Sequence, residues 1–194
     1  MLGKSTPATL STQTSLSEPS PDVTITERCY GLILLRHAPN EDVTIMNTSI
    51  LLIHQKRPPP LLPYWGFPKG HPEPGDASPW ATALRELREE TGLNPDTVQR
   101  IDLSPVAEGG KPLRLWSQYP SRMGGMKQVT YFVGTVEEHD EVTVQDEEVV
   151  ECRWVVLGDA WKTIKIRWVM DVLEKVIQYV RKEIPVDERE TEAW

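Results

Sequence analysis

Three glutamates, Glu86, Glu89 and Glu90, stand close together in the sequence and could do chemistry as a group. Their i, i+3 and i+4 spacing places all three carboxylates on one side of a single helical turn. Carboxylates held this close repel one another, which ordinarily costs stability. A hard divalent cation converts that repulsion into binding, because Mg²⁺ and Mn²⁺ prefer oxygen ligands. The pattern therefore predicts a metal site, of a kind that usually serves phosphate chemistry.

The residues around the glutamates set this turn apart from an ordinary solvated acidic surface, which is what most such runs are. From Arg85 to Leu93 the chain reads RELREETGL, and a glycine- and proline-rich loop precedes it. This order resembles the second half of the Nudix hydrolase signature at every fixed position. In the first half, Asp76 stands where the signature has glutamate, and eight residues instead of seven separate it from Arg85. We expect the extra residue to lie near 77–79, in the loop or first helical turn, where an insertion costs little.

The resemblance to the Nudix family implies a role for each of these residues. The metal ligands would be Glu86, Glu89, Glu90 and the backbone carbonyl of Gly70, with Mg²⁺ as the cofactor and Mn²⁺ able to substitute. Arg85 would brace the glutamates through ion pairs. The family's reaction is attack of a metal-activated water on phosphorus. For the general base we predict Glu89, with Glu86 as the alternative.

A further metal-binding glutamate often lies outside the signature in this family. Here the acidic run QDEEVVECRW precedes a predicted strand. The resemblance favours Glu148 over Glu147, because Glu148 stands six residues before Trp154 in an Arg-Trp strand pattern. An acidic solvent-exposed loop is an equally open interpretation of this run.

The loop before the helix resembles one branch of the family, the asymmetrical diadenosine tetraphosphate hydrolases. Trp65, the run Pro68-Lys69-Gly70-His71 and the run Glu73-Pro74-Gly75 match that branch. Lys69 and His71 suit phosphate oxygens as a point charge and a donor.

A later strand pattern and one arginine extend the predicted substrate site. The run KQVTYF resembles a strand of the same branch, in which Lys127 would meet phosphate and Tyr131 would stack on an adenine. Base stacking contributes roughly 1–3 kcal/mol. A strand tyrosine is more often ordinary packing, so that interpretation stays open. Arg36 could contact phosphate or could be a plain surface arginine.

We therefore expect a metal-dependent pyrophosphohydrolase whose partner is a small-molecule polyphosphate. It would cleave a dinucleoside polyphosphate asymmetrically, to a nucleoside triphosphate and a nucleoside monophosphate. The alternative within the fold is a diphosphoinositol polyphosphate phosphohydrolase, which basic residues keep open: Lys56, Arg57, Lys111, Arg114, Arg122 and Lys127. A non-catalytic nucleotide-binding regulatory module is disfavoured because Glu86, Glu89 and Glu90, the glutamates expected to bind the metal, are all present.

Alternating secondary-structure signals predict the elements that position these residues. Strands are expected at 28–36, 49–54, 113–119, 128–136 and 149–156. Residues 56–70, with five prolines, are expected to form a shaped loop. A helix is expected to begin at Ser78-Pro79 and end at Gly92, and a second helical pattern runs from Ile166 to Ile184. The resemblance implies an α/β fold of the Nudix type, an α/β/α sandwich with a mixed sheet flanked by helices.

Composition bounds the class of protein. The 194 residues are 39% hydrophobic and carry a net charge of −8, which argues against a nucleic-acid or anionic-membrane partner. The Ser/Thr/Pro-rich residues 1–25 are expected to be a disordered tail, 26–186 the domain, and 187–194 a frayed end. Without a signal-peptide pattern, the expected compartment is the cytoplasm, with nuclear access possible. The sequence does not determine the oligomeric state.

Overall fold

Strand β1 (Ile25–His37) is the centre of a mixed sheet in the computed structural model, which describes residues 24–38, 43–101, 115–136, 142–144 and 147–181. β1 pairs antiparallel with β2 (Thr48–Gln55) and parallel with β7 (Met126–Val136). The remaining strands pair with these three: β3 (Tyr64–Gly66) and β8 (Val149–Val156) with β2, β4 (Lys69–Gly70) with β1, and β5 (Gln99–Ile101) and β6 (Leu115–Pro120) with β7.

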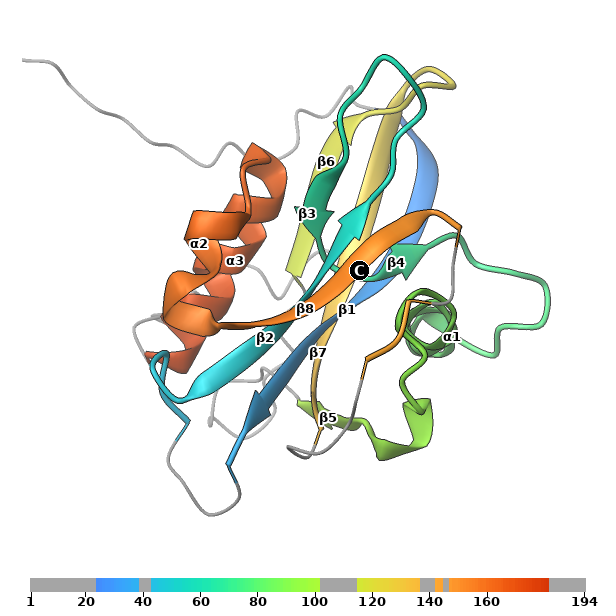
Figure 1. The fold of residues 1–194 in the computed structure, drawn as a ribbon. Coiled ribbons are helices and arrows are strands. Elements are labelled where there is room, and N and C mark those ends of the chain that lie inside the picture. Colours follow the sequence, from blue (N-terminus) through green and yellow to red (C-terminus); the bar gives the residue numbers. More distant parts are fainter. Residues whose placement is uncertain (1–23, 39–42, 102–114, 137–141, 145–146, 182–194) are drawn as a thin grey trace, which may run out of the picture.

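The sheet separates two apolar cores, because successive side chains of a strand point to opposite faces. Along β1, Leu32 and Leu34 pack with helix α1 (Pro79–Thr91), whereas Ile33 and Leu35 pack with helix α3 (Arg167–Val180). Figure 1 shows α1 on one side of the sheet, with α3 and the short α2 (Ala160–Thr163) on the other. The predicted arrangement, a mixed sheet flanked by helices, is confirmed.

Helix α1 begins and ends where its sequence signals predict. The Ser78 side chain accepts a hydrogen bond from the N–H of Ala81 at 3.2 Å, and Pro79 opens the helix. Gly92 ends it in the left-handed conformation, with φ of 72°, which glycine adopts without steric cost. The helix therefore has the predicted bounds.

The proline-rich segment differs from the prediction. Residues 56–70 are not only loop, since they contain β3 and β4. β3 is three residues long and pairs with the preceding strand β2, whereas β4 is two residues long and pairs with β1, far earlier in the chain. Strands this short carry no recognisable alternating pattern in the sequence. The β4 pairing brings Lys69 opposite Gly31 and thereby attaches the loop to the sheet beside α1.

Other predicted bounds are close to those observed. The strand predicted at 149–156 has its predicted bounds, and β1 and β7 extend beyond theirs. Strand β1 begins at Ile25, the last residue that the sequence assigned to the N-terminal tail. Two 3-10 turns, Pro95–Thr97 and Leu157–Asp159, were not predicted. Residues 1–23, 182–194, Lys111 and Arg114 lie outside the described residues. In the described part of the chain, no helix is long and apolar enough to cross a membrane.

Candidate active site

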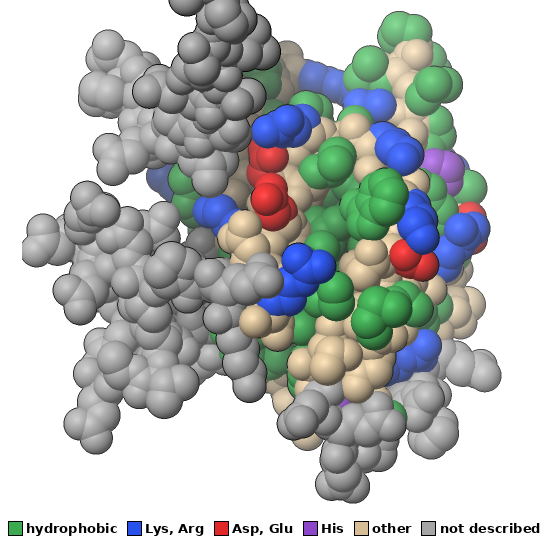
Figure 2. All heavy atoms as spheres, turned by 90° about the vertical axis from the view of Figure 1, so that its left-hand side faces the viewer, with side chains coloured by type: hydrophobic (Ala, Val, Ile, Leu, Met, Phe, Trp, Pro, Cys, Tyr) green, Lys and Arg blue, Asp and Glu red, His purple; other side chains and the backbone are tan. Residues whose placement is uncertain are grey.

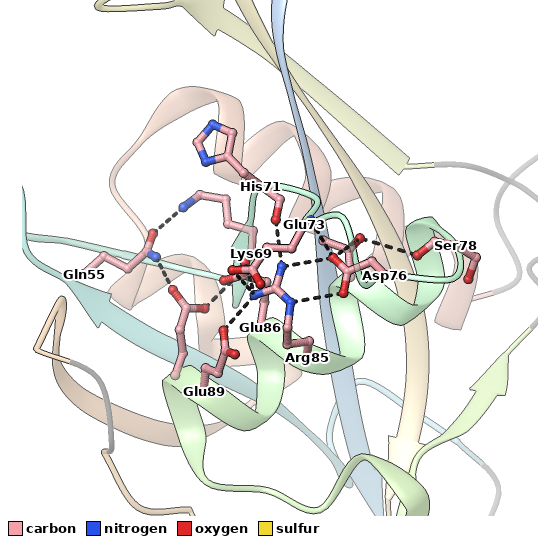
Figure 3. Close-up of polar contacts among 11 residues, drawn as sticks. Gln55, Lys69, His71, Glu73, Asp76, Ser78, Arg85, Glu86 and Glu89 are labelled. Atoms are coloured by element: carbon pink, nitrogen blue, oxygen red, sulfur yellow. Dashed lines mark hydrogen bonds and ion pairs between the residues drawn. The ribbon is translucent and has the colours of Figure 1, made fainter.

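Arg85 lies at the centre of the site and joins the helix to the loop before it (Figure 3). Its Nη1 donates to Glu86 at 2.9 Å and to Glu89 at 2.7 Å. Its Nη2 donates to the backbone carbonyl of His71 at 2.7 Å. The Arg85 side chain is only 14% exposed, so its guanidinium is largely shielded from solvent, whereas its partner Glu89 is 44% exposed. Arg85 thus forms ion pairs with Glu86 and Glu89, two of the three glutamates that it was expected to brace.

Asp76 holds the other edge of the Arg85 guanidinium. Its carboxylate accepts from Nε and Nη2 of Arg85, both at 3.1 Å, and also from the Thr82 hydroxyl and the N–H of Glu73, both at 2.9 Å. The hydrogen bonds from Arg85 lower the pKa of Asp76 to about 2. The extra residue between Asp76 and Arg85 thus leaves their pairing intact.

Gly70 lies directly against the Glu86 carboxylate. A Cβ added at Gly70 would lie 2.1 Å from that carboxylate, so no other residue fits here unless Glu86 moves. Burial raises the pKa of Glu86, and the Arg85 guanidinium opposes this effect. The predicted ligands Gly70 and Glu86 are therefore neighbours, brought together by β4 and α1.

Glu90 occupies a different environment from the other two glutamates. It is 3% exposed, whereas the Glu89 side chain is 44% exposed. Its two oxygens accept from Nε2 of Gln55 at 2.8 Å and from the N–H of Lys69 at 2.9 Å. Burial raises the pKa of Glu90 to about 8. A carboxylate this deeply buried would gain most from a nearby cation.

Gln55 connects Glu90 to Tyr64 and Lys69 and was not predicted from the sequence. Its Oε1 accepts from the Lys69 ammonium at 2.7 Å and from the Tyr64 hydroxyl at 2.6 Å. Burial opposes the charge of Lys69, but Tyr64 and Glu90 outweigh burial and raise its pKa overall. The only sign of Gln55 in the sequence was a polar residue at the end of an apolar strand. Its role depends on hydrogen-bond partners that only folding brings to it.

His71 and Lys127 meet at a residue that was not predicted, Glu27. The Glu27 carboxylate lies 3.2 Å from Nε2 of His71 and 3.5 Å from Nζ of Lys127. The predicted phosphate-binding residues from the loop and from β7 therefore lie close together.

Two predicted substrate-binding residues are not presented to this site. Tyr131 is 2% exposed and packs edge-on against Phe67, so the structure does not offer its ring for stacking on an adenine. The Arg36 guanidinium lies 4.3 Å from the centre of the Trp154 ring. It stands five residues along β1 from Gly31, the partner of Lys69, which is about 16 Å at strand spacing. Both predictions rested on strand position without knowledge of burial.

Glu148 lies in the turn before β8, at the edge of the site. Its backbone carbonyl accepts from the N–H of Lys56 at 2.7 Å, and the next residue, Val149, pairs with Gln55. This pairing places the acidic turn near the strand end that contacts Glu90.

The oxygen donors of the site suit a hard divalent cation. The Glu86 and Glu89 carboxylates share one nitrogen of Arg85, and Gly70 leaves the space that the Glu86 carboxylate fills. Among the described residues, no three His, Cys, Asp or Glu side chains are already gathered as a metal-binding group. Arg85 holds two of the glutamates, and Gln55 with Lys69 holds Glu90, so binding a cation requires these carboxylates to turn toward one another.

Comparisons with known proteins identify the family. A family model described as the NUDIX domain matches residues 36–176, and the chain belongs to this family. The asymmetrical bis(5'-nucleosyl)-tetraphosphatase of Sus scrofa is 27% identical over 158 residues, which cover 79% of this chain and 95% of that protein. The chain is accordingly assigned as a Nudix pyrophosphohydrolase.

Solved structures show the same fold. The chain aligns with the binary complex of C. elegans Ap4A hydrolase at a TM-score of 0.62 and 22% identity, covering 80% of this chain and 98% of that one. It also aligns with the NUDIX domain of Shewanella oneidensis NrtR, a cocrystal with ADP ribose, at a TM-score of 0.57 and 17% identity, covering 88% and 95% of the two chains.

Proposed function

We propose that this enzyme hydrolyses dinucleoside polyphosphates asymmetrically, in a divalent-metal-dependent reaction. The observation that carries the proposal is the physical link between the loop of residues 65–76, here called the substrate loop, and helix α1 with its three glutamates. Lys69 connects to Glu90 through Gln55, and the carbonyl of His71 is held by the same guanidinium that holds Glu86. A polyphosphate bound by the loop would therefore lie beside the carboxylates. The activity named for the Sus scrofa relative supports this substrate class.

The carboxylates have separate tasks in this proposal. Glu86, Glu89, Glu90 and the Gly70 carbonyl would hold Mg²⁺, with Mn²⁺ able to replace it. When bound, the cation lowers the pKa of water and neutralises charge on the phosphate oxygens. Glu89 is the most exposed of the three carboxylates, so it can accept the proton of the attacking water, with Glu86 as the alternative base. Arg85 keeps both candidates oriented.

The substrate loop supplies the positive charge. Lys69 places an ammonium at the inner end of the site, where Gln55 and Tyr64 orient it. His71 and Lys127 lie further out and can donate to the phosphate chain. Figure 2 shows that the face covered by α2 and α3 carries Lys and Arg side chains among apolar ones, with few acidic side chains in view. Because α1 lies on the other side of the sheet from this face (Figure 1), the charge that we propose for phosphate binding beside the glutamates comes from Lys69 and Lys127.

One assay tests the proposal against its rivals. The protein is incubated with diadenosine tetraphosphate or with a diphosphoinositol polyphosphate, in Mg²⁺ or in EDTA, and the products are separated by anion exchange. We expect ATP and AMP in equal amounts from diadenosine tetraphosphate, only with Mg²⁺. ADP as the sole product would refute asymmetric cleavage, and preferred turnover of the inositol compound would favour the diphosphoinositol alternative. No metal-dependent turnover of any substrate would reject the metal-dependent reaction.

Glu89→Gln tests the assignment of the base. The substitution should lower kcat by roughly 10²- to 10⁴-fold, the usual contribution of a positioned base. Because Glu89 is 44% exposed, the thermal unfolding midpoint should change little. Glu174→Gln, an exposed glutamate on α3, is the control with the same charge change and should retain full activity. An unchanged kcat in Glu89→Gln would remove Glu89 as the base.

A further inference from the structure

Three donors from separate parts of the chain converge on the carboxylate of Glu27. His71 comes from the loop after β4, Lys127 from β7, and Ser121 from the turn between β6 and β7. His71 Nε2 lies 3.2 Å and Lys127 Nζ lies 3.5 Å from the same carboxylate oxygen, and the Ser121 hydroxyl donates to the other oxygen. A carboxylate surrounded in this way occupies an anion-binding site.

The position of Glu27 places this cluster beside the loop that follows β4. Glu27 and Lys127 are opposite each other in the pairing of β1 with β7, and His71 follows directly after Gly70 in the substrate loop. The Glu27 and Lys127 side chains are 17% and 19% exposed, whereas that of His71 is 59% exposed. The cluster therefore lies partly buried at the outer end of the loop, with one donor open to solvent.

The same donors suit a phosphate group as well as they suit a carboxylate. An ammonium, an imidazole and a hydroxyl are ordinary phosphate partners, and their geometry here is already preformed. A phosphate can use Lys127 and His71 fully only if the Glu27 carboxylate turns away. A carboxylate that stays in place repels the incoming phosphate across a few ångströms.

We propose that Glu27 is a specificity-determining residue that competes with substrate phosphate for Lys127 and His71. It limits the affinity of the site for long polyphosphate chains and favours substrates whose charge is concentrated at the inner end, beside Lys69. This inference rests on the proposed function, because it takes the loop and β7 as the phosphate-binding side of the site. In this proposal Glu27 affects the binding of substrate phosphate, whereas the glutamates of α1 bind the metal and take part in the reaction.

The first test measures anion binding and does not require catalysis. Inorganic tripolyphosphate is titrated calorimetrically into the full chain in metal-free buffer at moderate salt. Glu27→Gln and Glu27→Ala should each bind about three- to tenfold tighter than the wild type, from the loss of one like charge near the anion. Glu174→Gln, with the same change in net charge but located on α3, should bind as the wild type does. The inference is overturned if the Glu27 variants bind no tighter than Glu174→Gln.

A double-mutant cycle tests whether Glu27 acts through Lys127. In the wild type Lys127 is engaged with Glu27, so Lys127→Gln should cost little anion affinity. In the Glu27→Gln background Lys127 is released, so the same substitution should cost several-fold more. An equal loss in both backgrounds would show that Glu27 and Lys127 act independently and would contradict the mechanism.

Turnover then connects the inference to the reaction. With diadenosine tri-, tetra- and pentaphosphate, the ratio of wild-type KM to Glu27→Gln KM should grow with the number of phosphates and shrink at high salt. A ratio that is the same for all three substrates would refute a role in chain-length selection. If the wild type hydrolyses none of them, the proposed function fails, while tripolyphosphate binding still decides the role of Glu27.

Discussion

Replacing Glu90 with glutamine should flatten the pH dependence of stability in metal-free buffer. Glu90 is 3% exposed, and burial raises its pKa from 4.5 to about 8. An acid with a raised folded-state pKa binds more protons in the folded than in the unfolded chain between these two values. The free energy of unfolding therefore falls as the pH rises through this window, and it recovers as the pH falls back toward 4.5.

The size of this effect follows from the two pKa values. Between pH 5 and pH 7.5, a single carboxyl group titrating at 4.5 when unfolded and about 8 when folded lowers the free energy of unfolding by about 3 kcal/mol. Glutamine cannot ionise, so the Glu90→Gln variant lacks this contribution. The slope is the quantity to compare, because the amide loses an acceptor for Gln55 or for the N–H of Lys69, at a pH-independent cost of about 1–3 kcal/mol.

Urea unfolding followed by tryptophan fluorescence measures the slope. Wild type, Glu90→Gln and the control Glu174→Gln are compared at several pH values with EDTA. Between pH 5 and pH 7.5, the free energy of unfolding of the wild type and of the control should fall by about 3 kcal/mol more than that of Glu90→Gln. Parallel curves for wild type and Glu90→Gln would refute the argument that burial opposes the charge.

A second arm of the same experiment adds Mg²⁺. A bound cation favours the ionised carboxylate, so it should stabilise the wild type increasingly as the pH rises. Glu90→Gln should gain much less. Equal stabilisation of both proteins would exclude Glu90 as a ligand, whatever the outcome of the metal-free arm.

Three further substitutions test the supporting contacts. Gly70→Ala should lower kcat at least about tenfold, since the new methyl overlaps the Glu86 carboxylate, and unchanged kcat would show that the loop gives way freely. Asp76→Asn should lower the free energy of unfolding at neutral pH by about 1–2 kcal/mol, because the folded-state pKa of Asp76 is about 2 and the ionised group stabilises the fold above pH 3.8. The difference between variant and wild type should vanish as the pH falls toward 2, and a difference that stays constant in acid unfolding would contradict this prediction. Gln55→Leu should raise KM and lower the unfolding midpoint, because Lys69 and Tyr64 lose their acceptor, and a change in the midpoint alone would confine Gln55 to a structural role.

The glutamate helix is the part of the site that the sequence could predict. Its amphipathic pattern, Ser78 cap, Pro79 start and Gly92 end are local features, and local features determine where a helix begins and ends. The i, i+3, i+4 spacing likewise places the glutamates on one side of the helix whatever the rest of the chain does. Asp76 and Arg85 could be paired from their places in the family signature, despite the extra residue between them.

The contacts that depend on distant parts of the chain could not be predicted in this way. Strand β4 exists because β1, far earlier in the chain, supplies its hydrogen-bond partners. His71 and Lys127 were both expected to bind phosphate, but both also contact Glu27. His71 follows Glu27 by 44 positions and Lys127 follows it by 100, so no local pattern could show this meeting. Burial is also a property of the packed molecule, and it decides that the Tyr131 ring is enclosed.

The sequence by itself determined the family, the glutamate helix and the chemistry that the glutamates suit, because spacing along one helix and caps at its ends are local. Only the tertiary structure decided how the three glutamates differ. Glu89 faces solvent, Glu86 lies against Gly70 and Glu90 is buried beside Gln55, because each meets a different neighbour once β2, β4 and α1 pack together. Carboxylates that are equivalent in the sequence thereby acquire different degrees of burial, different hydrogen-bond partners and different proposed tasks.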